Sequence, residues 1–380
     1  MTHPFIPLKT NLFQKIHNSL KLIVIVCKIR KKWKTLVPEH RKGFATVIGD
    51  MLYLIWKQDA KTKWFLIDYF NSHLWRKDCD IHEYVMWNEW LRLKQRIDVG
   101  EMVEILEHKG RSWAYFHQRG YPVTKRLGIL SLENGSACCK RTDGRIQPLA
   151  ELLKETGGVF VKPDDEMQGK GCARLTPSER AEQGCCINGV EADDKALTNL
   201  LRKPLHVEEL IRQHPRIAAF HPQSINTLRL ITMVKPEGGI ELNRAVLRMG
   251  TGVRSTDNWC TGGLAVQIIG DGTLNRLGWF EEGSVPPTEA HPDTQVAFAG
   301  YEIPFYHEAV DLVLRAHGEC KDTWGIGWDV AITSEGPILI ESNVCFANFQ
   351  PLCGGLRETM EKRLRPLAEA AEQSLSMSDR

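Results

Sequence analysis

Short apolar runs separated by turn residues recur between residues 159 and 340. Residues 330–332 and 338–340 are apolar and flank the turn at residues 334–337, so this pattern predicts a β-hairpin. The apolar residues 159–161 and the segment 172–175 flank a glycine-containing stretch. This second pattern predicts a strand, a loop and another strand.

Helical spacing of apolar residues marks two further segments. Residues 80–97 predict an amphipathic helix whose aromatic stripe is expected in the core, and residues 355–375 predict a carboxy-terminal helix. Residues 47–66 alternate apolar and polar side chains, which predicts a hairpin. The aromatic stripe consists of Tyr84, Trp87, Trp90 and Leu91.

The amino-terminal segment is strongly basic. Eight lysines and arginines and no acidic residue lie between Lys9 and Lys34, around the apolar run 20–27. That run is too short and too interrupted to span a bilayer. It predicts either a basic helix that lies on an anionic membrane surface, or a helix packed against its own domain. A nucleic-acid-binding arm is disfavoured, because no aromatic set beyond Trp33 is interleaved with the charges.

Composition indicates an ordinary globular protein. The residues are 42% hydrophobic and 25% charged. With 380 residues, the chain is long enough for two or three lobes. The net charge of +2 gives no overall sign of nucleic-acid binding. The eleven cysteines show no zinc-binding spacing. Their odd number, without a recognisable signal peptide, favours reduced thiols and a cytoplasmic protein, peripheral at the inner face of the membrane if the basic helix binds lipid.

Three oxygen-bearing side chains lie at the ends of the predicted hairpin strands. Glu341 and Asn343 are two residues apart and so share a strand face, and Asp329 lies across from them on the partner strand. Oxygen-only ligands suit magnesium, which often also binds nucleotide phosphates. The pattern predicts a magnesium site, with a solvent-facing polar strand end as the alternative.

A lysine and two glycines form a second candidate site. Lys162 follows the apolar run 159–161, and Gly169 and Gly171 lie in the loop beyond it. Glycine lets backbone amides approach a phosphate closely, and a lysine at the end of a buried strand supplies fixed positive charge. Neither a P-loop nor a dinucleotide-binding fingerprint is present in its proper context, and an ordinary turn is the alternative.

Two arginines lie on successive apolar strands. Arg229 and Arg248 flank the turn at residues 235–239, so paired strands would aim both guanidinium groups at one pocket. Their planar forks suit carboxylate and phosphate oxygens. Alternatively, each arginine pairs with a nearby surface acid.

Four segments together resemble the ATP-grasp enzymes, and within them the sugar-transfer-associated group related to glutamate ligases. The resemblance covers residues 104–352. It implies an α+β ATP-grasp fold, in which two α+β lobes grip ATP, preceded by a smaller amino-terminal region with a basic helix. The segments are LEHKGRSWAYFHQRGYPV, VFVKPDDEMQGKGCARL, HPQSINTLRLITMV with LRMGTGVRSTDNWCTGG, and GWDVAITSEGPILIESN.

The resemblance also implies roles for residues around the nucleotide. Lys109 and Lys162 are similar to the family's two phosphate-binding lysines, and the loop with Gly169 and Gly171 would close over the phosphates. Residues 205–211 are similar to the hinge that reads adenine and ribose, partly through a glutamate. Glu208 and Glu209 remain alternatives for that glutamate, because strand neighbours face opposite ways. The segment with Asp257 and Asn258 is similar to the one that positions the acyl group being activated, and Asn258 is favoured over Asp257 for that role.

The predicted division of the chain follows from these segments. It comprises a basic helix at 1–40, an amino-terminal and pre-grasp region at 41–148, a small lobe with the glycine loop at 149–206, a large lobe with the metal site at 207–355, and a carboxy-terminal helix at 356–380.

The implied reaction joins a carboxylate to an amine, with ATP and Mg2+ as cofactors. The catalytic candidates Arg229, Arg248 and Asn258 would hold a carboxylate that attacks ATP, giving an acyl phosphate, which an amine on a sugar or peptide-like acceptor then displaces. A phosphotransferase and a nucleotide-binding protein without turnover are the alternatives. Many such ligases have a Pro-Gly turn after the metal asparagine, but Asn343 is followed by Val344, which leaves the acceptor open.

Overall fold

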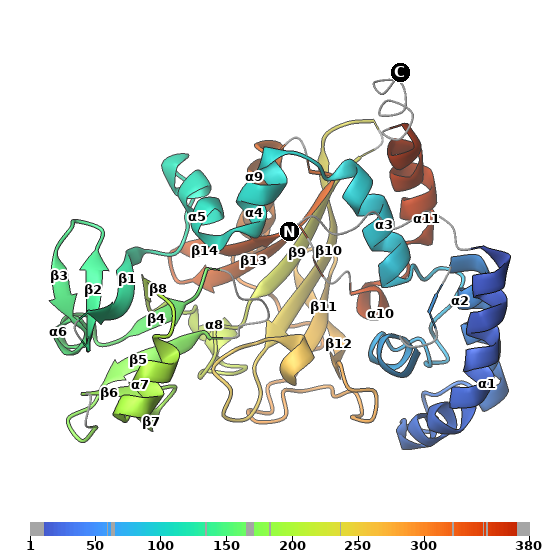
Figure 1. Cartoon of the computed structure of the whole chain (residues 1–380), viewed down its shortest axis with the longest axis horizontal. Coiled ribbons are helices and arrows are strands. Elements are labelled where there is room, and N and C mark those ends of the chain that lie inside the picture. The colour runs from blue at the N-terminus through green and yellow to red at the C-terminus, as the bar shows by residue number, and fades with distance from the viewer. Residues whose placement is uncertain are drawn as a thin grey trace.

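Two β-sheets lie side by side and are covered by helices (Figure 1). The computed structural model describes residues 11–58, 60–61, 65–133, 135–164, 171–181, 184–235, 237–320, 323–344, 346 and 349–370.

An eight-stranded antiparallel sheet forms one lobe, in the order β3-β2-β1-β8-β4-β5-β6-β7. Leu152 and Leu197, from its two helices, share one buried cluster with Val161 and Val207 of the sheet. Its elements are β1 (Arg126–Glu133), β2 (Ser136–Arg141), β3 (Ile146–Pro148), α6 (Leu149–Thr156), β4 (Val159–Lys162), β5 (Ala173–Pro177), β6 (Cys185–Ile187), β7 (Val190–Glu191), α7 (Asp194–Leu200) and β8 (Leu205–Glu209). Strands β1 to β3 lie before residue 149, the expected start of the small lobe, yet they belong to the same sheet.

A six-stranded antiparallel sheet forms the second lobe, in the order β12-β11-β10-β9-β13-β14. Leu230 on β9 is buried in a cluster with Phe116 and Leu312, whereas its neighbour Ile231 is buried in a cluster with Trp90. Alternate residues of the strand therefore face helices on opposite sides of the sheet. The strands are β9 (Leu228–Val234), β10 (Ile240–Met249), β11 (Leu264–Ile269), β12 (Thr273–Phe280), β13 (Gly325–Thr333) and β14 (Gly336–Asn343).

Helices cover both faces of the six-stranded sheet. One face carries α4, α5 and α9, and α3 and the carboxy-terminal helices cover the other (Figure 1). These elements are α3 (Trp87–Ile97), α4 (Glu101–Glu107), α5 (Lys109–Gln118), α8 (Pro215–Ala218), a 3-10 helix (Trp259–Thr261), α9 (Tyr306–Gly318), α10 (Gln350–Cys353), α11 (Arg357–Thr359) and a π-helix (Met360–Leu364).

The amino-terminal region is helical and has its own core. Helices α1 (Leu12–Thr35) and α2 (Phe44–Gln58) and a π-helical turn (Phe65–Tyr69) enclose buried residues that include Leu22, Leu54 and Trp75. None of the helices in the described ranges has the length and apolar character that a membrane crossing requires.

The hairpin predicted for residues 47–66 is wrong, because residues 44–58 form helix α2. Val47, Met51, Leu54 and Ile55 are buried at spacings of four, three and one, which places them on one helical face. The apparent alternation of apolar and polar residues was therefore a helical pattern sampled over a short stretch.

The helix predicted for residues 80–97 begins only at Trp87. The expected aromatic stripe is divided, because Tyr84 packs in the amino-terminal core and Trp90 packs beneath the six-stranded sheet. The carboxy-terminal helical prediction is confirmed for residues 357–370, and its last residues lie outside the described ranges.

Candidate active site

A cleft of about 1980 Å³ opens between the two sheets and collects most of the predicted site residues. Gly169 lies outside the described residues, and Gly171 is placed at the end of the loop with a φ of +71° that favours glycine. Trp87 and Leu91 of α3 also line the cleft. The predicted residues that line the cleft are Lys109, Lys162, Glu208, Glu209, Arg229, Arg248, Asn258, Asp329, Glu341 and Asn343.

The predicted hairpin places the metal candidates together. Asp329 on β13 lies directly opposite Glu341 on β14, and Asn343 lies opposite Gly327. The pairing shifts just after Asp329, since Val330 pairs with Leu339, and this bulge leaves an extra residue on β14 beside the site. Nothing in the apolar pattern of the two strands indicated the bulge.

The donor set fits magnesium and not a metal that requires nitrogen or sulfur ligands. It offers two carboxylates and one amide oxygen. Water and substrate phosphates commonly complete the coordination shell of magnesium. The described residues contain no group of three or more histidine, cysteine, aspartate or glutamate side chains placed to hold a metal. Asp329, Glu341 and Asn343 therefore suit a metal that arrives with a nucleotide.

Both predicted arginines pair with Asp329. Arg229 Nε lies 2.5 Å from Asp329 Oδ1, and Arg248 Nη2 lies 3.0 Å from Oδ2. All three side chains are buried. Burial alone would raise the pKa of Asp329, but the two guanidinium groups outweigh it and lower that pKa. The alternative that each arginine pairs with a surface acid is therefore wrong.

Asp257 extends this network from the loop before Asn258. Its carboxylate accepts a hydrogen bond from the backbone N–H of Thr227 at 3.0 Å and lies 3.4 Å from Arg248 Nη2. Burial raises the pKa of Asp257, and Arg248 opposes that rise. Asn258 lines the cleft itself, and its backbone oxygen accepts from Gly263 N at 3.0 Å. Asp257 thus orients the arginine, a role that its turn-like sequence context did not indicate.

A second buried carboxylate lies in the eight-stranded sheet. Lys162 Nζ lies 2.7 Å from Glu208 Oε1, and Arg126 Nε lies 3.6 Å from the same oxygen. Glu209 instead pairs with Lys125 at 2.5 Å; the Lys125 side chain is exposed and that of Glu209 is partly exposed. The expected alternation along the strand is therefore present, with Glu208 as the glutamate beside Lys162.

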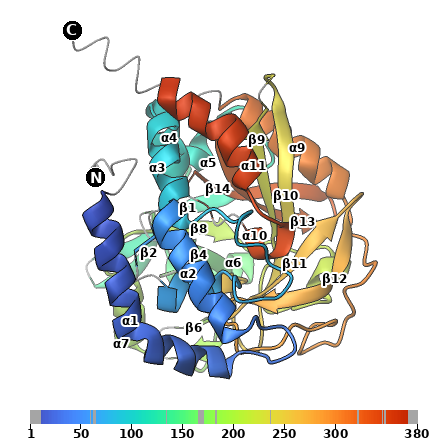
Figure 2. The ribbon, with the colours of Figure 1, turned by 90° about the vertical axis from the view of Figure 1, so that its right-hand side faces the viewer.

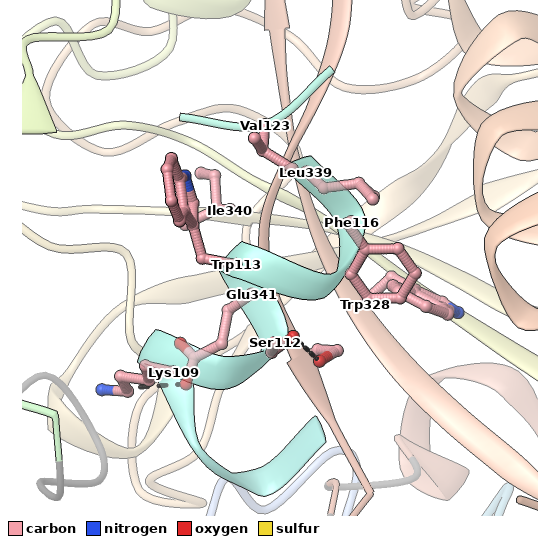
Figure 3. Close-up of a pocket in the computed structure, with 10 residues that line it drawn as sticks. Lys109, Ser112, Trp113, Phe116, Val123, Trp328, Leu339, Ile340 and Glu341 are labelled. Carbon is pink, nitrogen blue, oxygen red and sulfur yellow. Dashed lines mark hydrogen bonds and ion pairs between the residues drawn. The ribbon is translucent and has the colours of Figure 1, made fainter. Parts of the chain in front are cut away.

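The amino terminus of α5 places Lys109 at the metal candidates. Its Nζ lies 3.7 Å from Glu341 Oε1, an ion pair that Figure 3 marks with a dashed line. Behind them, Ser112 and Ser342 share a hydrogen bond of 2.7 Å, which links α5 to β14. Lys109 is the first residue of α5.

Asp164 joins α5 to the segment after β4. Its Oδ1 accepts a hydrogen bond from the backbone N–H of Gly110 at 2.8 Å and is 3.0 Å from His206 Nε2. Burial would raise the pKa of Asp164, but the hydrogen bond and charge of His206 lower it overall. A side chain at position 110 would meet Asp164 Oδ1 at 2.9 Å, so Gly110 permits this close approach. Asp164 thereby fixes Lys109 relative to Lys162.

Residues 90–354, which are most of the chain, match the family model described as sugar-transfer associated ATP-grasp. This match confirms the ATP-grasp fold predicted from the four sequence segments. No curated protein matches the chain by sequence.

Several solved structures resemble the chain at low similarity. D-alanyl-alanine synthetase A from Vibrio cholerae O1 biovar eltor is 11% identical, with 69% of this chain and 65% of that chain covered and a TM-score of 0.38. N5-carboxyaminoimidazole ribonucleotide synthetase from Thermus thermophilus is 14% identical, with 69% and 52% covered and a TM-score of 0.34. L-amino acid ligase from Bacillus licheniformis is 12% identical, with 66% and 43% covered and a TM-score of 0.34. The chain spans less than two thirds of the length of each of these three proteins.

Proposed function

The chain belongs to the sugar-transfer associated ATP-grasp family, and on that premise we propose that it is an ATP-dependent carboxylate–amine ligase. The observation that carries the proposal is one cleft that is lined both by lysines and by oxygen-bearing side chains. Lys109 and Lys162 supply the positive charge, and Asp329, in the middle of β13 and not at the strand end expected from sequence, lies opposite Glu341 near the end of β14. This combination suits a nucleotide triphosphate with its magnesium ion.

Asp329, Glu341 and Asn343 would hold magnesium, which, when bound, neutralises charge on the terminal phosphates of ATP. Lys109, beside Glu341, and Lys162, beside Glu208, would bind the phosphate oxygens, so that charge developing during transfer is stabilised by groups already in position. Glu208 beside Lys162 is proposed as the glutamate that meets the nucleotide, because Glu209 pairs with Lys125 instead.

The proposed chemistry needs two steps and no nucleophile from the protein. A carboxylate oxygen of the first substrate attacks the terminal phosphorus of ATP, which breaks the bond to ADP and forms an acyl phosphate. The amine of the second substrate then attacks the acyl carbon, phosphate leaves and the nitrogen loses a proton. Arg229, Arg248 and Asn258 line the cleft where the first carboxylate would bind.

The substrate classes are proposals of the same kind. We expect an amino acid or a similar acid as the carboxylate, and an amino sugar or a peptide-like amine as the acceptor. Trp87, Leu91 and Phe349 line the cleft on the side of α3 and α10, and they would offer an apolar wall to the acceptor. The ten cysteines in the described ranges are all free thiols, which supports our proposal of a cytoplasmic enzyme.

Parallel measurement of ADP and inorganic phosphate tests the ligase. Purified protein receives magnesium-ATP with pooled amino acids and amino sugars, and we expect equal release of both products only when a carboxylate and an amine are present. Glu341→Gln should abolish this turnover, because it removes a proposed metal ligand. Glu335→Gln, in the exposed turn of the same hairpin, is the matched control and should turn over normally.

Other outcomes would replace the proposal. ADP without free phosphate, with phosphate retained on the product, would identify a phosphotransferase that uses the same nucleotide site. Hydroxylamine distinguishes that result from a trapped acyl phosphate, because it converts the acyl phosphate to a hydroxamate. Nucleotide binding without any release under all substrate pools would favour a binding protein without turnover.

A further inference from the structure

Helix α1 has apolar residues on two opposite sides, and only one side is buried. Asn18, Leu22 and Ile29 are buried at spacings of four and seven residues, and Ile25 packs against the same core. These spacings place the residues on one helical face. On this face α1 packs against the amino-terminal core, as the sequence-based alternative of a helix packed against its own domain predicted.

The opposite face of α1 is an exposed apolar surface, which we name the outer stripe. Its spacings of four, four and three to four residues keep these side chains together, on the side away from Leu22. Phe13 and Val24 are 79% and 80% exposed. Figure 2 shows α1 along the outside of the molecule. The outer stripe consists of Leu12, Phe13, Ile16, Leu20, Ile23 and Val24.

The charges around the outer stripe are all positive along α1. The helix carries seven lysines and arginines and no acidic residue. Lys21 and Lys28, seven residues apart and exposed, form one edge of the stripe, and exposed Lys31 lies in the last turns of the helix. An apolar surface bordered by positive charges fits a partner that has an anionic surface over an apolar interior.

Trp56 of α2 extends the apolar surface beyond the other edge. Its indole Nε1 donates to Ser19 Oγ at 3.2 Å, and its side chain stays partly exposed. A tryptophan with one polar contact and an exposed apolar ring suits the boundary between lipid tails and headgroups.

We propose that α1 docks the protein onto an anionic lipid surface, with the outer stripe among the acyl chains and the lysines at the headgroups. Contact through the outer stripe between two copies is disfavoured, because it would bring the two sets of seven cations together. A nucleic acid would leave the apolar side chains without a partner. The helix would lie on the bilayer, in keeping with the finding on membrane spans above.

This docking goes beyond the proposed ligase activity and can be tested without it. The full chain is mixed with vesicles of phosphatidylcholine alone or with about 30% phosphatidylglycerol, and flotation measures the bound fraction. We expect flotation with the anionic vesicles, roughly fivefold less binding for each of Lys21→Gln and Lys28→Gln, and weaker binding at high salt. The double variant Ile23→Glu with Val24→Glu should lose at least about tenfold in binding.

Val190→Glu is the matched control for the apolar change. Val190 is 71% exposed, close to the 80% of Val24, but lies on β7 in the eight-stranded sheet. Its substitution should leave flotation unchanged. Because Ile23 and Val24 are exposed, their replacement should also leave the circular dichroism spectrum and the urea unfolding curve unchanged.

Three results would overturn the proposal. The first is a protein that floats with neither vesicle, and the second is a loss of binding in Val190→Glu as large as that in the double variant. Sedimentation velocity gives the third: if the double variant turns an oligomer into a monomer and the unchanged protein does not float, the outer stripe is a contact between copies. If the unchanged protein floats with anionic vesicles but shows no ATP turnover, the result would count against the proposed ligase function and not against the docking.

Discussion

Each of the two sheets buries one carboxylate beside the cleft, but the two are held differently. In the eight-stranded sheet, Lys162 and Arg126 approach the same oxygen of Glu208, at 2.7 Å and 3.6 Å. In the six-stranded sheet, Asp329 gives each oxygen to a different arginine, at 2.5 Å and 3.0 Å, on strands β9 and β10. In the second arrangement each carboxylate oxygen has a guanidinium group of its own.

This difference separates stability from ligand binding. Arg229 lies directly opposite Asp329 in the strand register, so the sheet itself holds the pair together. Lys162 is instead the last residue of β4, directly before the loop that contains Gly171. We therefore expect changes around Asp329 to weaken the fold, and changes around Lys162 to weaken mainly the binding of nucleotide.

The largest expected effect is that of Arg229→Met. It removes one of two guanidinium groups from a buried carboxylate, so we expect a loss of about 4 kcal/mol in the free energy of unfolding. Urea unfolding followed by tryptophan fluorescence measures the change. Arg126→Met is the comparison in the other sheet and should cost about 1 to 2 kcal/mol, because Lys162 remains close to Glu208. Equal losses of unfolding free energy would show that the buried charges of Asp329 and Glu208 depend equally on their arginine partners.

Acid should loosen the six-stranded sheet through His317. Burial lowers the pKa of this histidine from 6.5 to about 4, and its ring bonds Thr232 Oγ1 at 2.7 Å and the backbone oxygen of Thr323 at 3.1 Å. Since the folded state disfavours the proton, its contribution to stability is fully present above pH 6.5. It is lost as pH falls toward 4, by about 3 kcal/mol at most.

His317→Gln checks that origin. The variant should show a flatter dependence of unfolding free energy on pH between 6.5 and 4 than the unchanged protein. His307→Gln, at an exposed position of the same helix, is the control and should retain the full slope. An unchanged slope in His317→Gln would assign the acid sensitivity to other groups, such as buried His73, whose pKa is also about 4.

Lys162→Met should weaken nucleotide binding more than it weakens the fold. The lysine lines the cleft and is proposed to contact phosphate, so we expect roughly 10- to 30-fold weaker binding of ATP in calorimetry. Lys125→Met is the matched control, because Lys125 also pairs with a glutamate of β8 but is exposed. Equal affinity in Lys162→Met and the unchanged protein would remove this lysine from the phosphate site.

Local patterns in the sequence predicted the parts of the site that a single hairpin or strand determines. The pairing of Asp329 with Glu341 follows from two apolar runs and one turn, and the position of Lys162 follows from the end of one strand. The partners of these residues come from distant segments: Asp329 pairs with Arg229 on β9, and Lys162 pairs with Glu208 on β8. No local periodicity encodes such contacts, so they required the three-dimensional structure.

The fold shows the same limit. The ATP-grasp fold was predictable because four motifs with a fixed order point to it. Helix α2 was not, because Val47 and Met51, four residues apart, fit a period of two as well as a helix, and only the spacing of three to Leu54 distinguishes the two. The membership of β1 to β3 in the eight-stranded sheet depends on pairing of β1 with β8, which lies far later in the chain, and turn signals cannot indicate such a pairing.

The smallest expected effect is that of Glu209→Gln, and it tests the assignment of the two neighbouring glutamates. Because Glu209 pairs with exposed Lys125 and its neighbour Glu208 takes the position beside Lys162, ATP affinity should change less than about twofold in Glu209→Gln. Glu208→Gln, whose side chain is buried beside Lys162, should weaken ATP binding at least about fivefold in the same titration. The reverse order would place Glu209 at the nucleotide, and the Lys162 pair would then be a feature of the sheet alone.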